Sequence, residues 1–234
     1  MGTLVTYTLA DGVATVTMDD GKVNALSLQM LGEVNGALDR AEADEAVVVL
    51  TGRPGRFSGG FDLGVINAGG VDAADMLNTG FELAERLLSF PRPVVIASTG
   101  HTIAMGAFLL LSGDYRIGVR GPFKITANEV AIGMTMPATA IQICRQRLTP
   151  AHFERAVLLA EVYAPDDAIA AGFLDRVVEE TELEQAAAEH ARALTALDAN
   201  AHRYSKLRAR REMLESLRNA IEADDAAVRG AFTA

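Results

Sequence analysis

The chain has 234 residues, of which 50% are hydrophobic, and its formal net charge at pH 7 is −10. This length can bury one substantial core without a second domain, and the acidic balance argues against binding to nucleic acid or to an anionic membrane surface. The longest apolar stretches, such as Ala107 to Leu111, are far shorter than the roughly 20 residues that span a bilayer. The mean hydropathy of +0.17 is high, and we expect the excess apolar surface to form a subunit interface.

The N-terminal segment also predicts where the protein works. Residues 1–7 show no basic leader followed by an apolar block, which a secretory signal would require. A single cysteine, Cys144, cannot form an internal disulfide and is typical of a reducing compartment. We therefore expect a cytoplasmic protein.

The first predicted elements are a hairpin and a helix. Residues 3–10 and 13–18 alternate and are rich in β-formers, with Asp11-Gly12 between them, which predicts a β-hairpin. Residues 26–43 carry apolar side chains at helical spacing, with Ser27 as the N-cap. The same two periodicities predict a strand at 47–50, a helix at 73–90, a strand at 94–97, short strands at 115–119 and 123–125, a final strand at 173–178 and two long amphipathic helices between 182 and 222. The alternation of strand and helix predicts parallel strand pairing.

Two of the strands run into a glycine-rich turn that is followed by a helix. The strand at 47–50 leads to the turn at 56–62, and the strand at 94–97 leads to the turn at 100–106. The first N–H groups of a helix have no partner within it and lie at its positive end. Two such turns can aim two backbone N–H groups at one oxygen, which is how an oxyanion hole is built.

Several other chemistries lack their sequence signature. There is no G-x-G-x-x-G after a strand and no G-x-x-x-x-G-K-[ST], so dinucleotide and P-loop binding are not indicated. There is no G-x-S-x-G elbow for a serine nucleophile. The four histidines are scattered without the spacing of metal ligands, and we expect no metal.

Five blocks of sequence then carry a family likeness. They are Gly21-Lys22-Val23-Asn24-Ala25-Leu26-Ser27, the run from Arg53 to Leu63, Arg92-Pro93-Val94-Val95-Ile96-Ala97, Met105-Gly106 with Gly113-Asp114-Tyr115-Arg116-Ile117, and Asn128-Glu129-Val130-Ala131-Ile132-Gly133. Their order and spacing over residues 10–180 resemble the crotonase superfamily of enoyl-CoA hydratases and isomerases. The resemblance implies an α/β fold with a ββα spiral core at residues 1–180 and a helical oligomerisation region at 181–234. It also implies an acyl-CoA thioester substrate, assembly into a homotrimer or a dimer of trimers, and no cofactor beyond the coenzyme A of the substrate.

The resemblance also implies a set of site residues. The two oxyanion donors correspond to the backbone N–H groups of Phe61 and Met105, and Met105 stands where the family usually has glycine. The substrate-binding positions correspond to Lys22, Val23, Ala25, Ser58, Gly60, Asp62, Leu63, Gly106 and Phe108. For Asp62, which follows a glycine turn, we favour a role as helix N-cap over direct catalysis.

The carboxylate count points to the reaction. Hydratases of this family use two glutamates, one at the position of Glu129 and one that falls on Phe108 in this chain. One carboxylate suffices to move a double bond, because it can take a proton from C2 and return it to C4. Glu129 facing Phe108 therefore resembles the Δ3,Δ2-enoyl-CoA isomerases, and desolvation by Phe108 would raise the proton affinity of Glu129.

Alternatives to the isomerase remain open from sequence. An enoyl-CoA hydratase could work with Glu129 alone or with another acid, and Met105 with Phe108 would also suit a CoA-binding protein without activity. Taken without its motif, Glu129 could be a solvated loop carboxylate. Arg203, Lys206 and Arg210 share one helix face, which is either solvated and paired with glutamates of that helix or a basic patch for CoA phosphates.

Overall fold

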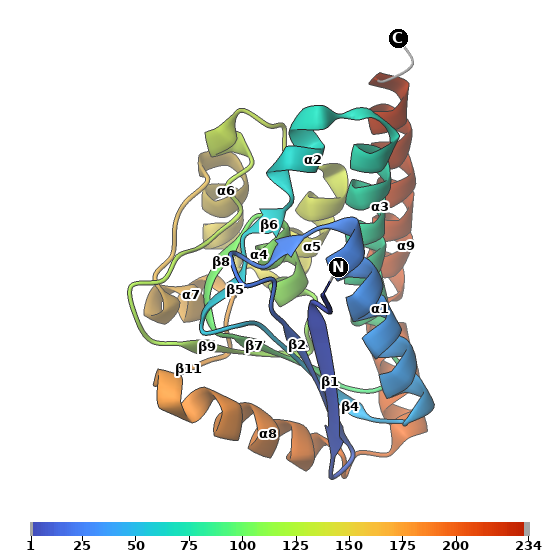
Figure 1. Cartoon of the computed structure of the whole chain (residues 1–234), viewed down its shortest axis with the longest axis vertical. Coiled ribbons are helices and arrows are strands. Elements are labelled where there is room, and N and C mark those ends of the chain that lie inside the picture. The colour runs from blue at the N-terminus through green and yellow to red at the C-terminus, as the bar shows by residue number, and fades with distance from the viewer. Residues whose placement is uncertain (1, 232–234) are drawn as a thin grey trace.

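The computed structural model describes residues 2–231 and is built around a six-stranded sheet (Figure 1). The strand order is β1-β2-β4-β7-β9-β11, where β1 and β2 are antiparallel and the following neighbours are parallel. The strands are β1 (Val5–Ala10), β2 (Val13–Met18), β4 (Val47–Thr51), β7 (Val94–Ser98), β9 (Tyr115–Val119) and β11 (Arg176–Val178). The predicted hairpin and the predicted parallel pairing are confirmed.

The glycine-rich turns contain more secondary structure than the sequence predicted. Each contains a short strand, β5 (Gly55–Ser58) or β8 (Gly100–Ile103), and these two strands pair in parallel within a second sheet. The third strand of this sheet is β10 (Ile125–Thr126), so the strand that we predicted at 123–125 begins only at residue 125. A further pair joins β3 (Ala25–Leu26) to β6 (Gly60–Phe61). Each turn therefore follows a strand-strand-helix course.

The main sheet is covered on both faces because alternate side chains of a strand point in opposite directions. Val48 and Leu50 of β4 face one apolar core, and Val47 and Val49 face another. The first core is covered by the helices α1 (Leu28–Ala43), α3 (Gly70–Ser89), α4 (Met105–Leu111), α5 (Ala138–Arg147) and α9 (Ala199–Ala231). The second is covered by α8 (Leu183–Leu194), which runs along the opposite side of the sheet (Figure 1).

The remaining helices lie around the cores. They are α2 (Leu63–Ala68), α6 (Pro150–Leu159), α7 (Pro165–Ala171) and the single-turn helices Val130–Ile132 and Glu180–Glu182. Ser27 caps α1, since its hydroxyl accepts the Met30 N–H, as predicted. Among residues 2–231, no helix is both long enough and apolar enough to cross a membrane.

Both C-terminal helices pack on the chain's own core. The two predicted helices are present, and α9 continues beyond the expected end to Ala231, packing on α3 and α5. This packing corrects both readings of the basic face of α9. Lys206 is buried, with its Nζ 2.7 Å from Asp114 Oδ2, and Arg210 Nη2 lies 2.9 Å from Asp114 Oδ1. These two cations therefore attach α9 to the start of β9. The division at residue 180 and the assembly role of 181–234 stay predictions.

Candidate active site

The sheet topology brings the two glycine-rich turns together. Because β4 and β7 are parallel neighbours, the turns that follow them lie at the same edge of the sheet. Contact is close: a Cβ added to Gly60 would lie 2.9 Å from Ala104 Cβ and 3.4 Å from Met105 N. Gly60 also has a φ of +89°, which a residue with a side chain adopts only under strain. Gly60 therefore sets the closest approach of the two turns.

The second turn ends in a strained residue that begins α4. Ala104, the N-cap of α4, has a φ of 52° and a ψ of −124°, a conformation that costs on the order of 1–3 kcal/mol for a residue with a side chain. Met105 is the first residue of that helix, so its N–H has no partner within the helix and lies at the positive end. This geometry suits the binding of a negatively charged oxygen.

The side chain of Met105 lies in the core. It is fully buried, and its Cε would be 3.7 Å from a Cβ added to Gly80 of α3. The same added Cβ would lie 2.4 Å from the ring of Phe61, so only glycine at position 80 leaves room for that ring. The methionine at this family glycine position is therefore accommodated by packing against α3.

A cavity of about 100 Å³ opens at this junction. It is lined by Gly59, Phe61, Leu63, Ile66, Leu77, Phe81, Ile103, Ala104, Phe108, Asn128, Glu129, Ile132, Met134 and Pro137. Three aromatic rings follow one another along it, with Phe61 at 5.9 Å from Phe81 and Phe81 at 6.4 Å from Phe108 between ring centroids. Among these lining residues only Asn128 and Glu129 carry polar side chains.

Glu129 carries the one titratable side chain of this lining. It precedes the single-turn helix Val130–Ile132, and its carbonyl accepts the Met134 N–H at 2.9 Å, which closes the turn. Its side chain is 6% exposed, and Oε2 is buried without a hydrogen-bond partner among the described residues. Burial raises the pKa of Glu129 to about 7, so the carboxyl can both accept and release a proton near neutral pH.

The segment at residues 22–25 is held against the first turn by backbone and amide hydrogen bonds. Asn24, with a φ of 52°, is fully buried and its Nδ2 donates to the carbonyls of Met18, Arg56 and Phe57. Gly59 N–H donates to the Val23 carbonyl at 2.8 Å. Val23 itself is exposed and lies beside Gly59, one of the residues that line the cavity. The exposed edge of this segment is thus available to a ligand.

Two predicted substrate-binding side chains are engaged within the protein. The Ser58 hydroxyl is buried, donates to the Asn24 carbonyl at 2.8 Å and accepts the Gly60 N–H at 3.1 Å. The Asp62 carboxylate accepts the Gly64 N–H at 2.8 Å, which confirms its predicted role as the N-cap of α2. Ser58 therefore shapes the site through its backbone and hydroxyl contacts.

The structure gathers part of the predicted site around the cavity. Phe61, Leu63, Phe108 and Glu129 line it. Gly60, Met105 and Gly106 do not line it, but Gly60 lies between the lining residues Gly59 and Phe61, and Met105 directly follows the lining residue Ala104. Lys22, Val23, Ala25, Ser58 and Asp62 are not among the lining residues.

Sequence reasoning gave no site role to several residues that line the cavity, and three of them are instructive. Asn128 was part of a recognised block but received no role, although its Oδ1 is buried without a partner in the same cavity as Glu129 Oε2. Leu77 and Phe81 come from α3, whose apolar positions looked like ordinary core. Only the packing of α3 across the two turns shows that they face a cavity.

Comparison with known proteins identifies the family. Residues 8–233 match the enoyl-CoA hydratase/isomerase family. The chain belongs to that family. Its relatives include the mitochondrial enoyl-CoA delta isomerase 1 of Mus musculus, 29% identical over 91% of this chain and 75% of the relative. A probable enoyl-CoA hydratase of Rhodobacter capsulatus is 29% identical over 77% of this chain and 70% of the relative.

A solved structure agrees with this family over nearly the whole chain. An enoyl-CoA hydratase/isomerase family protein of Pseudomonas syringae superimposes with a TM-score of 0.93 and 50% identity, covering 95% of this chain and 96% of the other. The predicted crotonase fold is confirmed. Membership of this family supports an enzyme that acts on acyl-CoA thioesters. The family includes both isomerases and hydratases.

Proposed function

We propose that the chain is an acyl-CoA double-bond isomerase that converts 3-enoyl-CoA into trans-2-enoyl-CoA, with Glu129 as its single acid and base. One observation carries the choice of isomerase. Glu129 is the only titratable residue in the cavity lining; by the family resemblance, Phe108 stands where the hydratases have their second glutamate. The coenzyme A belongs to the substrate, and no further cofactor is invoked.

The first half of the proposed reaction removes a proton. The Glu129 carboxylate takes the proton from C2, and the electron pair of the C–H bond moves into the thioester to give a dienolate. The developing negative charge on the thioester oxygen is met by the N–H groups of Phe61 and Met105. A well-placed oxyanion donor is typically worth roughly 3–4 kcal/mol, so two of them offset much of the cost of forming the dienolate.

The second half returns the same proton at C4. Protonated Glu129 donates to C4, the double bond forms between C2 and C3, and the carboxylate is restored. A pKa of about 7 suits this cycle, because neither the acceptance nor the release of the proton is strongly uphill. Apart from Asn128 and Glu129 the lining is apolar, which disfavours water that would otherwise compete for the dienolate.

Hydration is the second candidate because of Asn128. Its Oδ1 and Glu129 Oε2 are both unpartnered acceptors in one cavity, and about 100 Å³ is enough for a water molecule. A water that donates to both oxygens would be oriented for attack on C3 of a trans-2-enoyl-CoA. This arrangement favours a hydratase without a second carboxylate, in which Glu129 takes a proton from the water as its oxygen bonds to C3 and then returns that proton to C2.

Separate assays with the two substrates test the choice. Purified protein is given 3-enoyl-CoA in one reaction and trans-2-enoyl-CoA in another, and the products are separated by chromatography. The proposal predicts rapid conversion of the first substrate and little 3-hydroxyacyl-CoA from the second. Faster formation of 3-hydroxyacyl-CoA would favour the hydratase, and tight CoA binding without turnover of either substrate would favour a binding protein.

A further inference from the structure

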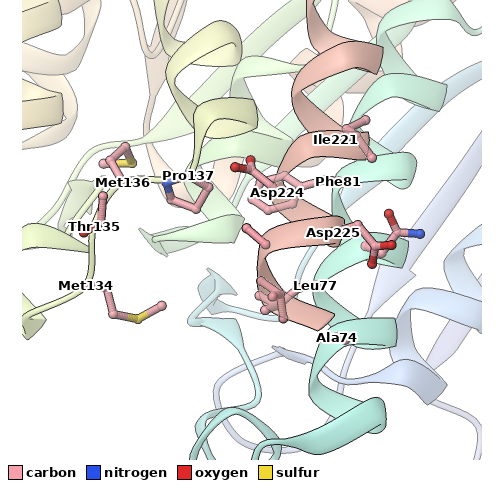
Figure 2. Close-up of a pocket in the computed structure, with 13 residues that line it drawn as sticks. Ala74, Leu77, Phe81, Met134, Thr135, Met136, Pro137, Ile221, Asp224 and Asp225 are labelled. Carbon is pink, nitrogen blue, oxygen red and sulfur yellow. The ribbon is translucent and has the colours of Figure 1, made fainter. Parts of the chain in front are cut away.

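A second, larger cavity lies beside the catalytic one. Its volume is about 310 Å³, and it is enclosed by one face of α3, one face of α9 and the segment 134–137 (Figure 2). The α3 residues that line it include Ala74 and Leu77, and the α9 residues include Ile221 and Val228, in each case spaced by one or two helical turns. The cavity therefore exists only because α9 folds back onto its own core.

The two cavities are adjacent and share part of their lining. Leu77, Phe81, Met134 and Pro137 line both of them, so these four side chains form a common border between the cavity that holds Glu129 and the larger one. The catalytic cavity has about a third of the volume of the larger one. An acyl chain whose first carbons fill the small cavity reaches the larger one by crossing this common border.

Two aspartates of α9 border the larger cavity, and their carboxylates form hydrogen bonds or ion pairs with other residues. Asp224 accepts the N–H of Ala138 at 3.1 Å and the N–H and Oγ1–H of Thr139 at 2.8 and 2.7 Å, so it caps the start of α5. Asp225 pairs with Arg229, which also pairs with Asp75 of α3 and so joins α9 to α3. These contacts fix the wall of the cavity and keep negative charge on it.

We propose that the larger cavity binds the distal part of the substrate's acyl group. The protein would therefore select substrates with medium and long acyl groups that have an uncharged end. The inference rests on the proposed function and names its substrate class. Hydrocarbon fits the apolar faces of α3 and α9. A tail that ends in a carboxylate is repelled by Asp224 and Asp225.

The expected effect follows from the burial of methylene groups. Burying one CH₂ is worth about 0.8 kcal/mol, which corresponds to about a fourfold increase in binding for each carbon added. Affinity for saturated acyl-CoAs and kcat/KM for 3-enoyl-CoAs should therefore rise with chain length from four carbons until the cavity is full. A terminal carboxylate on a ten-carbon chain should lower the affinity by about tenfold or more.

A matched pair of variants localises the effect. Val228→Phe fills the larger cavity from α9, whereas Ala226→Phe adds the same ring to an exposed α9 position that lines neither cavity. The measured quantity is the ratio of the ten-carbon to the four-carbon value, for both kcat/KM and the Kd of saturated acyl-CoAs. We expect Val228→Phe to lower this ratio by at least about tenfold and Ala226→Phe to leave it unchanged.

The outcomes separate this inference from the proposed function. Equal affinity of the wild-type protein for four- and ten-carbon acyl-CoAs would overturn the inference, as would an equal effect of both phenylalanine variants. If saturated acyl-CoAs bind more tightly with length but no 3-enoyl-CoA is isomerised, the chain-length inference holds and the proposed function fails. The wild-type series and the terminal-carboxylate comparison decide the matter even if Val228→Phe does not fold.

Discussion

Gly60 and Ala104 touch across the two glycine-rich turns: a Cβ at residue 60 would lie 2.9 Å from the Cβ of residue 104. Both residues have positive φ, +89° and 52°, and each is followed at once by one of the two proposed oxyanion donors, Phe61 and Met105. The contact therefore fixes how far apart those donors lie.

Gly60→Ala should damage catalysis more than folding. The added methyl group must push Ala104 away, and the alanine must keep the positive φ of residue 60. We therefore expect kcat/KM to fall by at least about a hundredfold and the free energy of unfolding to fall by about 1–3 kcal/mol. The matched control is Gly36→Ala in α1, where an added Cβ meets nothing within 4 Å. That variant should keep full activity and gain up to about 1 kcal/mol of stability. Full activity of Gly60→Ala would show that the spacing of the turns is unimportant.

The activity should depend on pH through Glu129 alone. The ionised carboxylate is the base, and its pKa is raised to about 7 by burial. We predict that kcat/KM for 3-enoyl-CoA rises about tenfold per pH unit below pH 7 and reaches a plateau above it. A bell-shaped profile, with a loss of activity on the alkaline side near pH 8, would instead reveal a second titrating group that acts as an acid.

Removal of the Glu129 charge should stabilise the protein in a pH-dependent way. The pKa is 4.5 for the free group and about 7 in the native state, so between these values the native state holds a proton that the unfolded state has released. The free energy of unfolding therefore falls as the pH rises through this window, by at most about 3–4 kcal/mol at 1.36 kcal/mol per unit. Glu129→Gln should raise the melting temperature at pH 8 and change it little at pH 4.5, as thermal unfolding at the two pH values would show.

A carboxylate at position 108 should move the chemistry towards hydration. Phe108 is 1% exposed and lines the cavity with Glu129, so Phe108→Glu places a second acid where family hydratases have one. We expect the ratio of hydration to isomerisation to rise by at least about tenfold. Phe108→Leu, which stays apolar, controls for loss of the ring and should leave that ratio low. If both variants changed the ratio equally, packing and not the carboxylate would be responsible.

The sequence predicted the framework well because its signals are local. Periodicity placed the hairpin and the strands at 47–50, 94–97 and 115–119 within two residues of their observed bounds. Ser27 and Asp62 cap helices as their positions before the first helical turn indicated. Such features depend only on a few neighbouring residues, so they can be recognised from a single sequence.

Features that depend on distant contacts were not predictable in the same way. Strands β5 and β8 are short and form only by pairing with distant segments, β5 with β8 and β8 also with β10, and their glycine content gave no strand signal in the sequence. Lys206 looked like a solvated helix residue because its partner, Asp114, is 92 residues away in the chain. Leu77, which lines both cavities, likewise acquires its place from the packing of α3 over the turns. Family likeness, not local pattern, supplied the pairing of Phe61 with Met105.

The central claim is that one carboxyl group transfers the proton, and the isomerase turnover of Glu129→Gln tests it most directly. The variant is compared with the wild-type protein at pH 8, with saturated acyl-CoA binding measured in parallel to show that the site is intact. We predict unchanged binding within about threefold and a loss of kcat of at least about a thousandfold, because the amide cannot accept the C2 proton. Undiminished turnover by Glu129→Gln would contradict the account.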